Sequence, residues 1–208
     1  MLAWYHPEGV DPQWVTPIIP EYDVGDHLVV DHAERIVQTS WQEVSENGID
    51  IAHFPIVHGT CEIQSFTVTS KGPTRHVVRR QKVSTPAGPV DSLIESEEFG
   101  PGVGVVRFSV EFEHIEAMQF CILTGITPID SNSLMMRFTL LVRPSEEIRR
   151  VRILGRLLLR DLMRQVEQDV IIWEHKRYAE RPCLVKGDGP IVEHRLWAKQ
   201  FYVSAPST

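Results

Sequence analysis

The sequence contains few cysteines, and none is placed to hold a metal cluster or to build a disulfide framework. Its 208 residues include three cysteines, Cys61, Cys121 and Cys183, which lie far apart in the chain. None belongs to a C-x-x-C pair, and none is followed by a histidine two or three positions later. This odd, dispersed set predicts no disulfide framework, no cysteine zinc site and no cysteine-held iron–sulfur cluster.

Excess positive charge and long apolar runs are also absent. Lys and Arg number 21 against 28 Asp and Glu, giving a net charge of −7. This balance argues against nucleic acid as the main partner and against an anionic membrane surface. No stretch reaches 18 uncharged apolar residues, and the N-terminus lacks the basic and apolar regions of a signal peptide. We therefore expect a cytoplasmic protein with no membrane span and no nucleic-acid partner.

The first part of the chain reads as a loop followed by an amphipathic helix. Four prolines interrupt residues 1–24, so the main domain is expected to occupy residues 25–208. Apolar spacing over residues 40–53 predicts a helix, with Ser40 and Glu43 as a capping box. Pro55 is expected to bend or end this helix.

The rest of the chain changes from strand-like to helix-like periodicity. Strands rich in β-branched and aromatic residues are expected at 61–69, 74–84, 105–114, 118–126 and 133–142. A long helix is expected from residue 145 to about residue 178, with an interruption at Gly155, and a short element at 191–203. The fold class is therefore α+β, with an antiparallel sheet covered on one face by the long helix.

The segment with the clearest chemistry has the pattern E-x3-D-x2-H-x4-H. It contains Glu46, Asp50, His53 and His58. Two neutral imidazoles close in sequence are a common start of a transition-metal site, although unrelated histidine pairs also occur. Asp50 lies one helical turn before His53, where its carboxylate is expected to accept a hydrogen bond from the second ring nitrogen.

A third ligand is expected from a distant carboxylate, and Asp169 is the best candidate. Its spacing from Leu162 and Val166 places it on the apolar stripe of the long helix, where an acid needs a partner. The alternative is a surface acid paired with Arg164 or Arg177. Two histidines and one carboxylate with open positions form the facial triad of non-haem Fe(II) oxygen chemistry.

These segments resemble the Rieske non-haem iron oxygenases, and especially their branch of 3-ketosteroid 9α-hydroxylase oxygenase components and cholesterol 7-desaturases. The resemblance is carried by residues 46–60, 167–176 (EQDVIIWEHK) and 187–203 (GDGPIVEHRLWAKQFYV). It implies that His53, His58 and Asp169 bind a mononuclear Fe(II), and that Asp50 links His53 to the cluster of a neighbouring subunit. It also implies a helix-grip fold (START-like or Bet v 1-like), in which a curved antiparallel sheet wraps around the long C-terminal helix.

One departure from the family pattern concerns the electron-storing domain. Members of the family carry a Rieske domain whose [2Fe–2S] cluster is held by C-x-H and C-x2-H pairs, and this chain encodes neither pair. Residues 1–24 look like the last strand and linker of such a domain. The chain is therefore expected to be a truncation, a fragment or one half of a split enzyme. The resemblance implies a ferredoxin and a reductase, or a separate Rieske-containing chain, as electron source, and a homotrimer.

The leading hypothesis is the catalytic domain of an oxygenase that hydroxylates or desaturates an apolar, polycyclic, steroid-like substrate. Two alternatives stay open: a non-catalytic ligand-binding or regulatory subunit on the same scaffold, and a zinc hydrolase using the same ligands. Several aromatic and methionine residues are candidates to line a substrate cavity, with an ordinary core as the alternative. They are Phe108, Phe112, Met118, Phe120, Met135, Met136 and Phe138.

Overall fold

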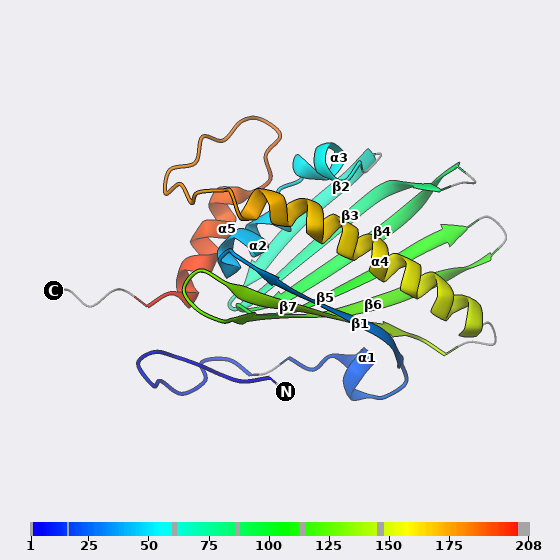
Figure 1. Cartoon of the computed structure of the whole chain (residues 1–208), viewed down its shortest axis with the longest axis horizontal. Coiled ribbons are helices and arrows are strands. Elements are labelled where there is room, and N and C mark those ends of the chain that lie inside the picture. Colours follow the sequence, from blue (N-terminus) through cyan, green and yellow to red (C-terminus); the bar gives the residue numbers. More distant parts are fainter. Residues whose placement is uncertain are drawn as a thin grey trace.

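The computed structural model contains one seven-stranded sheet, a long helix and several short helices (Figure 1). It describes residues 2–15, 17–59, 62–85, 88–112, 115–144 and 148–203, without the side chains of 62, 84–85, 110–112 and 115–118. In chain order the elements are α1 (Pro20–Asp23), β1 (Leu28–Val37), α2 (Trp41–Asn47), α3 (His53–Val57), β2 (Glu62–Lys71), β3 (Thr74–Thr85), β4 (Gly88–Phe99), β5 (Val103–Phe112), β6 (Ile115–Pro128), β7 (Leu134–Val142), α4 (Ile148–Trp173), α5 (Ile191–Ala198) and the 3-10 helix η1 (Lys199–Phe201).

The sheet is antiparallel throughout, in the order β1-β7-β6-β5-β4-β3-β2. Six consecutive strands form a meander, and β1 adds to its free edge beside β7. The α+β class is confirmed, and each of the five expected strands overlaps one of the observed strands, although β7 begins at Leu134 and residues 113–114 are not described. Two strands, β1 and β4, were not expected. Cys61 lies outside the described residues.

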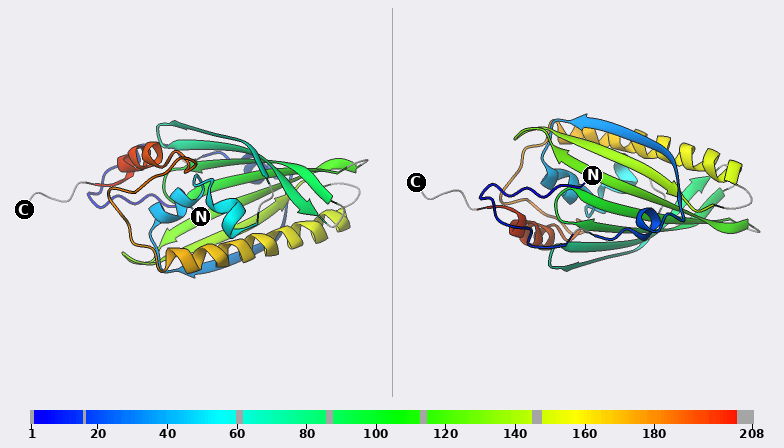
Figure 2. Two further views of the ribbon diagram at one scale, coloured as in Figure 1. Left: turned by 90° about the horizontal axis from the view of Figure 1, so that it is seen from above. Right: turned by 90° about the horizontal axis from the view of Figure 1, so that it is seen from below.

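The long helix packs across one face of the sheet, where it covers β1 and β7 (Figures 1 and 2). Alternate residues of the strands point toward it, as the two-residue period of a strand requires. The resulting core joins Phe120, Ile122, Leu140 and Val142 of the sheet to the helix. Helices α2 and α3 lie on this same face (Figure 2).

Gly155 does not interrupt α4, contrary to the expectation. It is buried at the middle of the contact between helix and sheet, where a Cβ atom would lie 2.9 Å from Leu140 Cδ2 and 3.5 Å from Phe120. Absence of a side chain therefore lets α4 approach β7 closely. The helix is continuous because packing on the sheet outweighs the modest helix propensity cost of one glycine.

The N-terminal segment lies against the opposite face of the sheet (Figure 2). Ile19, just before α1, packs on Val105, Cys121 and Leu141, which alternate with the residues that face α4. The Arg107 guanidinium on this face pairs with the Glu21 carboxylate. These contacts attach α1 to the back of the sheet.

The expected C-terminal element consists of α5 and η1. Trp197 of α5 donates a hydrogen bond from its indole Nε1 to the carbonyl of Gly72, at 2.9 Å, and its ring contacts Trp41 and Phe201. The C-terminal helix is thereby fixed beside α2 and the β2–β3 turn. Of the helices that the structure describes, none combines the length and the apolar character that crossing a bilayer requires.

Candidate metal centre

The predicted single helix over residues 40–53 is two short helices separated by a turn. Helix α2 ends at Asn47, and α3 begins at His53. Pro55 is the third residue of α3 rather than a helix breaker, because the N–H groups of a first turn have no partner within the helix. The expected capping box is wrong as well, since Ser40 makes no side-chain capping bond and Glu43 instead forms an ion pair with Lys176.

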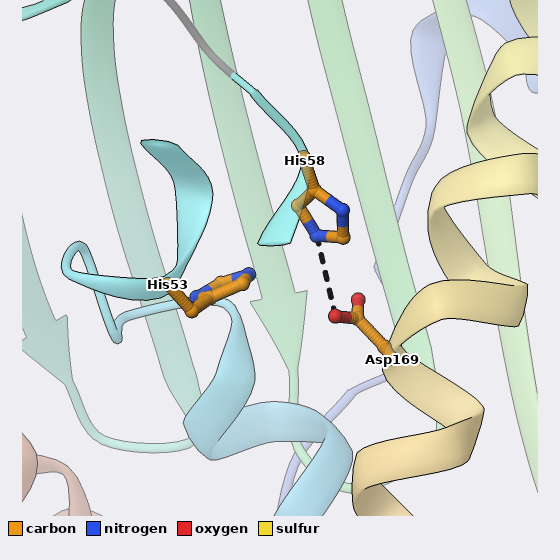
Figure 3. Close-up of side chains that lie close together, drawn as sticks. All are labelled: His53, His58 and Asp169. Carbon is orange, nitrogen blue, oxygen red and sulfur yellow. Dashed lines mark ion pairs between the residues drawn. The ribbon is translucent and has the colours of Figure 1, made fainter. Parts of the chain in front are cut away.

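The turn brings both motif histidines toward the long helix. His53 is the first residue of α3 and His58 is its C-cap, and their ring centroids lie 5.0 Å apart. Asp169 projects from α4 toward them (Figure 3). His58 Nε2 lies 3.2 Å from Asp169 Oδ1, and one ligand atom from each of the three residues lies within 4.8 Å of the others. The structure thus brings the three predicted ligands together, and Asp169 is not the surface acid of the alternative interpretation.

The hydrogen bonds around the two histidines determine which ring nitrogens face one another. His53 Nδ1–H donates to the main-chain carbonyl of Asp50 at 2.5 Å, and His58 Nδ1–H donates to Gln168 Oε1 at 3.1 Å. Each Nδ1 therefore carries a proton, which leaves the Nε2 lone pair of each neutral ring directed toward the centre. Metal-ligating histidines are held in this way in most proteins.

The arrangement leaves three acceptors facing one another in a buried space. His53 is 9% exposed and Asp169 is 6% exposed. Asp169 Oδ1 accepts no hydrogen bond from the described residues, while Oδ2 accepts one from the Asn47 amide at 3.1 Å. Two lone pairs and a carboxylate repel each other unless a cation or a proton lies between them. The donor set of two imidazoles and one carboxylate therefore fits a divalent transition metal.

The pKa shifts of the two histidines agree with this electrostatic account. Burial lowers the pKa of His53, which favours the neutral, metal-binding form. Burial also acts to lower the pKa of His58, but the Asp169 carboxylate and the Gln168 side chain together raise it. A proton on His58 thus partly takes the place of a cation when no metal is bound.

The Asp50 residue supports His53 through a different atom from the one expected. The main-chain carbonyl accepts the ring hydrogen bond, whereas the nearest carboxylate oxygen lies 4.0 Å from His53 Nδ1. The carboxylate caps the turn by accepting the N–H of Ala52 at 3.1 Å, and its side chain is 37% exposed. Glu46 does not share its surroundings, because it is buried and pairs with Arg195 at 2.7 Å.

Three further residues complete the centre, and the sequence interpretation did not include them. Asn47 contacts both Asp169 and His53, and Gln168 holds His58. A Cβ atom on Gly189 would lie 1.7 Å from the carbonyl oxygen of Ile49, so the chain before α5 packs directly on the turn that carries Asp50. Gln168 could have been found as the neighbour of Asp169, whereas the contact of Gly189 depends on the tertiary fold.

A cavity of about 890 Å³ opens beside the centre, between the sheet and α4. His58 and Asp169 lie in its wall, together with Phe54. Of the candidate lining residues, Phe108, Phe120 and Phe138 line it, while Met135 and Met136 do not. The side chains of Phe112 and Met118 lie outside the described residues. The volume falls within the range of small-molecule sites in proteins, roughly 300–1,000 Å³.

Comparison with known sequences identifies the family. The family described as 3-Ketosteroid 9alpha-hydroxylase C-terminal domain matches residues 3–202. The chain belongs to this family. A cholesterol 7-desaturase of Caenorhabditis elegans is 30% identical over 97% of the chain and 52% of its own length. The oxygenase component of a Rhodococcus rhodochrous 3-ketosteroid-9-alpha-monooxygenase is 24% identical over 80% of the chain and 44% of its own length.

Solved structures agree in fold with this family assignment. Dicamba monooxygenase bound to dicamba matches 95% of this chain and 64% of its own chain, with a TM-score of 0.66 and 15% sequence identity. At this level of identity the likeness shows a shared fold alone. The chain spans about half the length of the curated relatives it matches.

Proposed function

We propose that this member of the 3-ketosteroid 9α-hydroxylase C-terminal domain family is the catalytic domain of a non-haem Fe(II) oxygenase. It would hydroxylate or desaturate an apolar, polycyclic, steroid-like substrate with O2. The observation that carries the proposal is the convergence of His53, His58 and Asp169 beside a large, mainly apolar cavity that His58 and Asp169 line. The printed names of the relatives, cholesterol 7-desaturase and 3-ketosteroid-9-alpha-monooxygenase, support the substrate class.

Each residue of the centre has a defined part in this proposal. His53 and His58 would bind Fe(II) through Nε2, and Asp169 would bind through its free Oδ1. The bound iron would supply the electron transfer that reduces O2 next to the substrate. Asn47 would hold Asp169 Oδ2, so that the carboxylate keeps one oxygen directed at the metal. The apolar cavity wall would orient the substrate and exclude water.

Asp50 is proposed to connect the centre to its electron source. Its carboxylate is half-exposed, while its carbonyl holds the buried ligand His53. A donor that docks at this surface would therefore approach the metal through one residue. The change Asp50→Asn should leave iron bound, because the carbonyl is unchanged, and should slow reduction of the centre by its protein donor. Loss of iron in this variant would contradict the proposed role.

The remaining features of the proposal follow from the family. Electrons would come from a ferredoxin and reductase or from a Rieske [2Fe–2S] cluster on a separate chain or domain, within a homotrimer in the cytoplasm. Residues 1–24 would link the catalytic domain, residues 25–208, to the cluster domain. The sheet and α4 would form a helix-grip fold of the START-like or Bet v 1-like kind. These statements stay predictions.

Metal and product analysis together test the proposal. Protein loaded anaerobically with Fe(II) should retain about one iron per chain, and His58→Ala should lose it. His175→Ala is the matched control, because His175 is an exposed histidine at the end of α4 that contacts the Ile171 carbonyl. With reductant and O2, a 3-ketosteroid or sterol should gain one oxygen atom or lose two hydrogen atoms. Protein that binds the steroid without iron and without turnover would instead support a ligand-binding or regulatory subunit.

A further inference from the structure

The cavity wall contains one charged side chain within an otherwise apolar row across the sheet. Directly paired residues of antiparallel strands share a face. The register aligns one such row across five strands, from β2 to β6, and each member of the row lines the cavity. The members are Phe66, Arg79, Ile94, Phe108 and Phe120. Arg79 therefore places a guanidinium in a row of the sheet that is otherwise aromatic and aliphatic, whereas the charged lining residues Asp161 and Arg164 come from α4 and pair with each other.

Arg79 differs from the other arginines of the protein interior. Arg75 pairs with Glu98, and Arg195 pairs with Glu46. Arg79 has no carboxylate partner among the residues that the structure describes, and its buried Nε makes no hydrogen bond to them. Burial lowers the pKa of Arg79 to about 10, so that the group is still charged at neutral pH. An unpaired cation in an apolar site is costly, and a negative ligand would remove that cost.

A second polar group without a partner lies next to this guanidinium. Gln81 is two residues further along β3, so both side chains project from the same face of the strand. Gln81 lines the cavity, is 5% exposed and leaves its Oε1 without a hydrogen bond within the described part of the chain. A side-chain amide can present a donor or an acceptor to a ligand. Arg79 and Gln81 thus form an adjacent polar pair directed into the cavity.

The polar pair is close to the candidate metal centre. The Arg79 guanidinium lies over the ring of Phe54, at 3.7 Å from its centroid. The same ring lies 4.0 Å from the ring of His53 and 6.0 Å from that of His58. One aromatic side chain therefore separates the cation from the predicted metal ligands, and a ligand held by Arg79 would extend from this end of the cavity along the apolar row.

We propose that the substrate of this cavity is an apolar polycyclic carboxylate whose acid group binds Arg79, with Gln81 as a second polar contact. This inference rests on the proposed function where it calls the ligand a substrate, and within the steroid-like class it predicts a preference for acids over neutral sterols. A guanidinium and a carboxylate form two parallel hydrogen bonds, which fix direction as well as position. The rings would lie against Ile94, Phe108 and Phe120, and the acid group would set which carbon lies beside the metal.

A matched pair of ligands tests the proposal by binding alone. The probes are a steroid carboxylic acid and its methyl ester, whose affinities for the full, metal-free chain are measured by titration calorimetry. The acid should bind about 10- to 100-fold more tightly than the ester, because a charged hydrogen-bonded pair replaces a neutral contact. In Arg79→Met, which keeps similar side-chain volume, the ratio should fall to about one while the ester still binds.

Controls separate this proposal from its alternatives. Arg80→Met changes an exposed arginine next to Arg79 on β3 and should leave the acid-to-ester ratio unchanged. Equal binding of acid and ester to the unaltered chain would overturn the proposal. A second result would also overturn the proposal. With Fe(II) bound, Arg79→Met would still bind the acid more tightly than the ester, and Asp169→Asn would not. The metal, and not Arg79, would then be binding the acid. The acid-to-ester ratio of the metal-free chain depends on neither iron binding nor turnover, so failure of the proposed function is seen separately.

Discussion

Two buried polar clusters contact the short helix α2, and they differ in whether their hydrogen-bond donors and acceptors are matched. One is the candidate metal-binding triad, His53, His58 and Asp169, where three acceptors converge. The other is the Arg75 network, which consists of Arg75, Ser45, Glu98 and His194. In that network the Arg75 guanidinium donates to Glu98 Oε1 at 2.5 Å, to the Ser45 carbonyl at 2.9 Å and also to His194.

The contrast shows which cluster stabilises the chain and which serves a ligand. Arg75 is 1% exposed and joins β3, β4, α2 and α5 through complementary donors and acceptors. The triad consists of three acceptors, and without a metal their repulsion is offset only in part, by a proton on His58 and by the Asn47 amide. Adjacent parts of α2 serve both clusters, since Ser45 contacts Arg75 and Asn47 contacts Asp169. The stable network therefore positions the helix that supports the open site.

The largest expected effect comes from breaking the Arg75 network. Arg75→Ala should lower the free energy of unfolding by about 3–5 kcal/mol, because it leaves Glu98 without its cation and opens a cavity under Trp197. Urea unfolding measures this change. Arg80→Ala, on the next and exposed position of β3, should change it by less than about 0.5 kcal/mol. Equal losses in the two variants would show that the network is not a source of stability.

At the triad, by contrast, we expect a substitution to reduce metal affinity and not to reduce the stability of the metal-free fold. Asp169→Asn should weaken Fe(II) binding more than about 100-fold, because it removes a charged ligand. At a pH well above the pKa of His58, where no His58 proton pairs with Asp169, the metal-free protein should unfold at the same or a higher urea concentration. The reason is that a buried carboxylate whose Oδ1 accepts no hydrogen bond is replaced by a neutral amide. Glu167→Gln, an exposed change on the same helix that weakens only the ion pair with Arg35, is the control for both measurements. A large loss of metal-free stability in Asp169→Asn would contradict the comparison.

The sequence was enough to predict which three residues converge in the candidate triad, because their chemistry is local in type and spacing. His53 and His58 lie five residues apart, and Asp169 is an acid on an apolar helical stripe. Neither signal depends on knowing the fold. The identity of the Asp50 acceptor was not predictable in this way, because any residue has a carbonyl and only the turn after α2 directs that of Asp50 at the ring.

The two strands that the sequence did not predict, β1 and β4, were missed for the same physical reason. β1 lies at the edge of the sheet, and its central charged residues Asp31, Glu34 and Arg35 interrupt the apolar–polar alternation that predicts a strand. β4 is an inner strand, but its sequence contains four acids, and most of its side chains are only partly buried. Both obtain their stability from pairing with neighbours, which single-sequence periodicity does not detect. The Arg75 network was missed for the same reason, since its members come from four separate elements.

A smaller effect is expected from the residue that holds a ligand without binding the metal. Gln168→Ala removes the acceptor of the His58 Nδ1–H bond, so the ring can adopt its other tautomer and rotate. We expect about 10-fold weaker Fe(II) binding, measured by competition with a chelator, and little change in unfolding. Gln165→Ala, one turn earlier on α4, removes a hydrogen bond to Asp161 and no contact to the triad. Unchanged metal affinity in Gln168→Ala would mean that Asp169 alone orients His58.

The smallest effect concerns the pH dependence of the Arg75 network. Burial, together with the neighbouring Arg75 cation, lowers the pKa of His194 to about 3. In the unfolded chain the pKa of this histidine has its ordinary value, about 6.5. Between pH 6.5 and pH 3 the unfolded state therefore binds one proton more than the folded state. Stability should therefore fall as pH falls through this range, with His194 contributing a loss of about 1 kcal/mol between pH 7 and pH 5.5. His194→Gln cannot take up this proton, and its unfolding free energy should fall less over the same interval, while His53 and His58 titrate in both proteins. Parallel pH profiles for the two proteins would show that His194 is already charged in the folded state, and that the network tolerates a second cation beside Arg75.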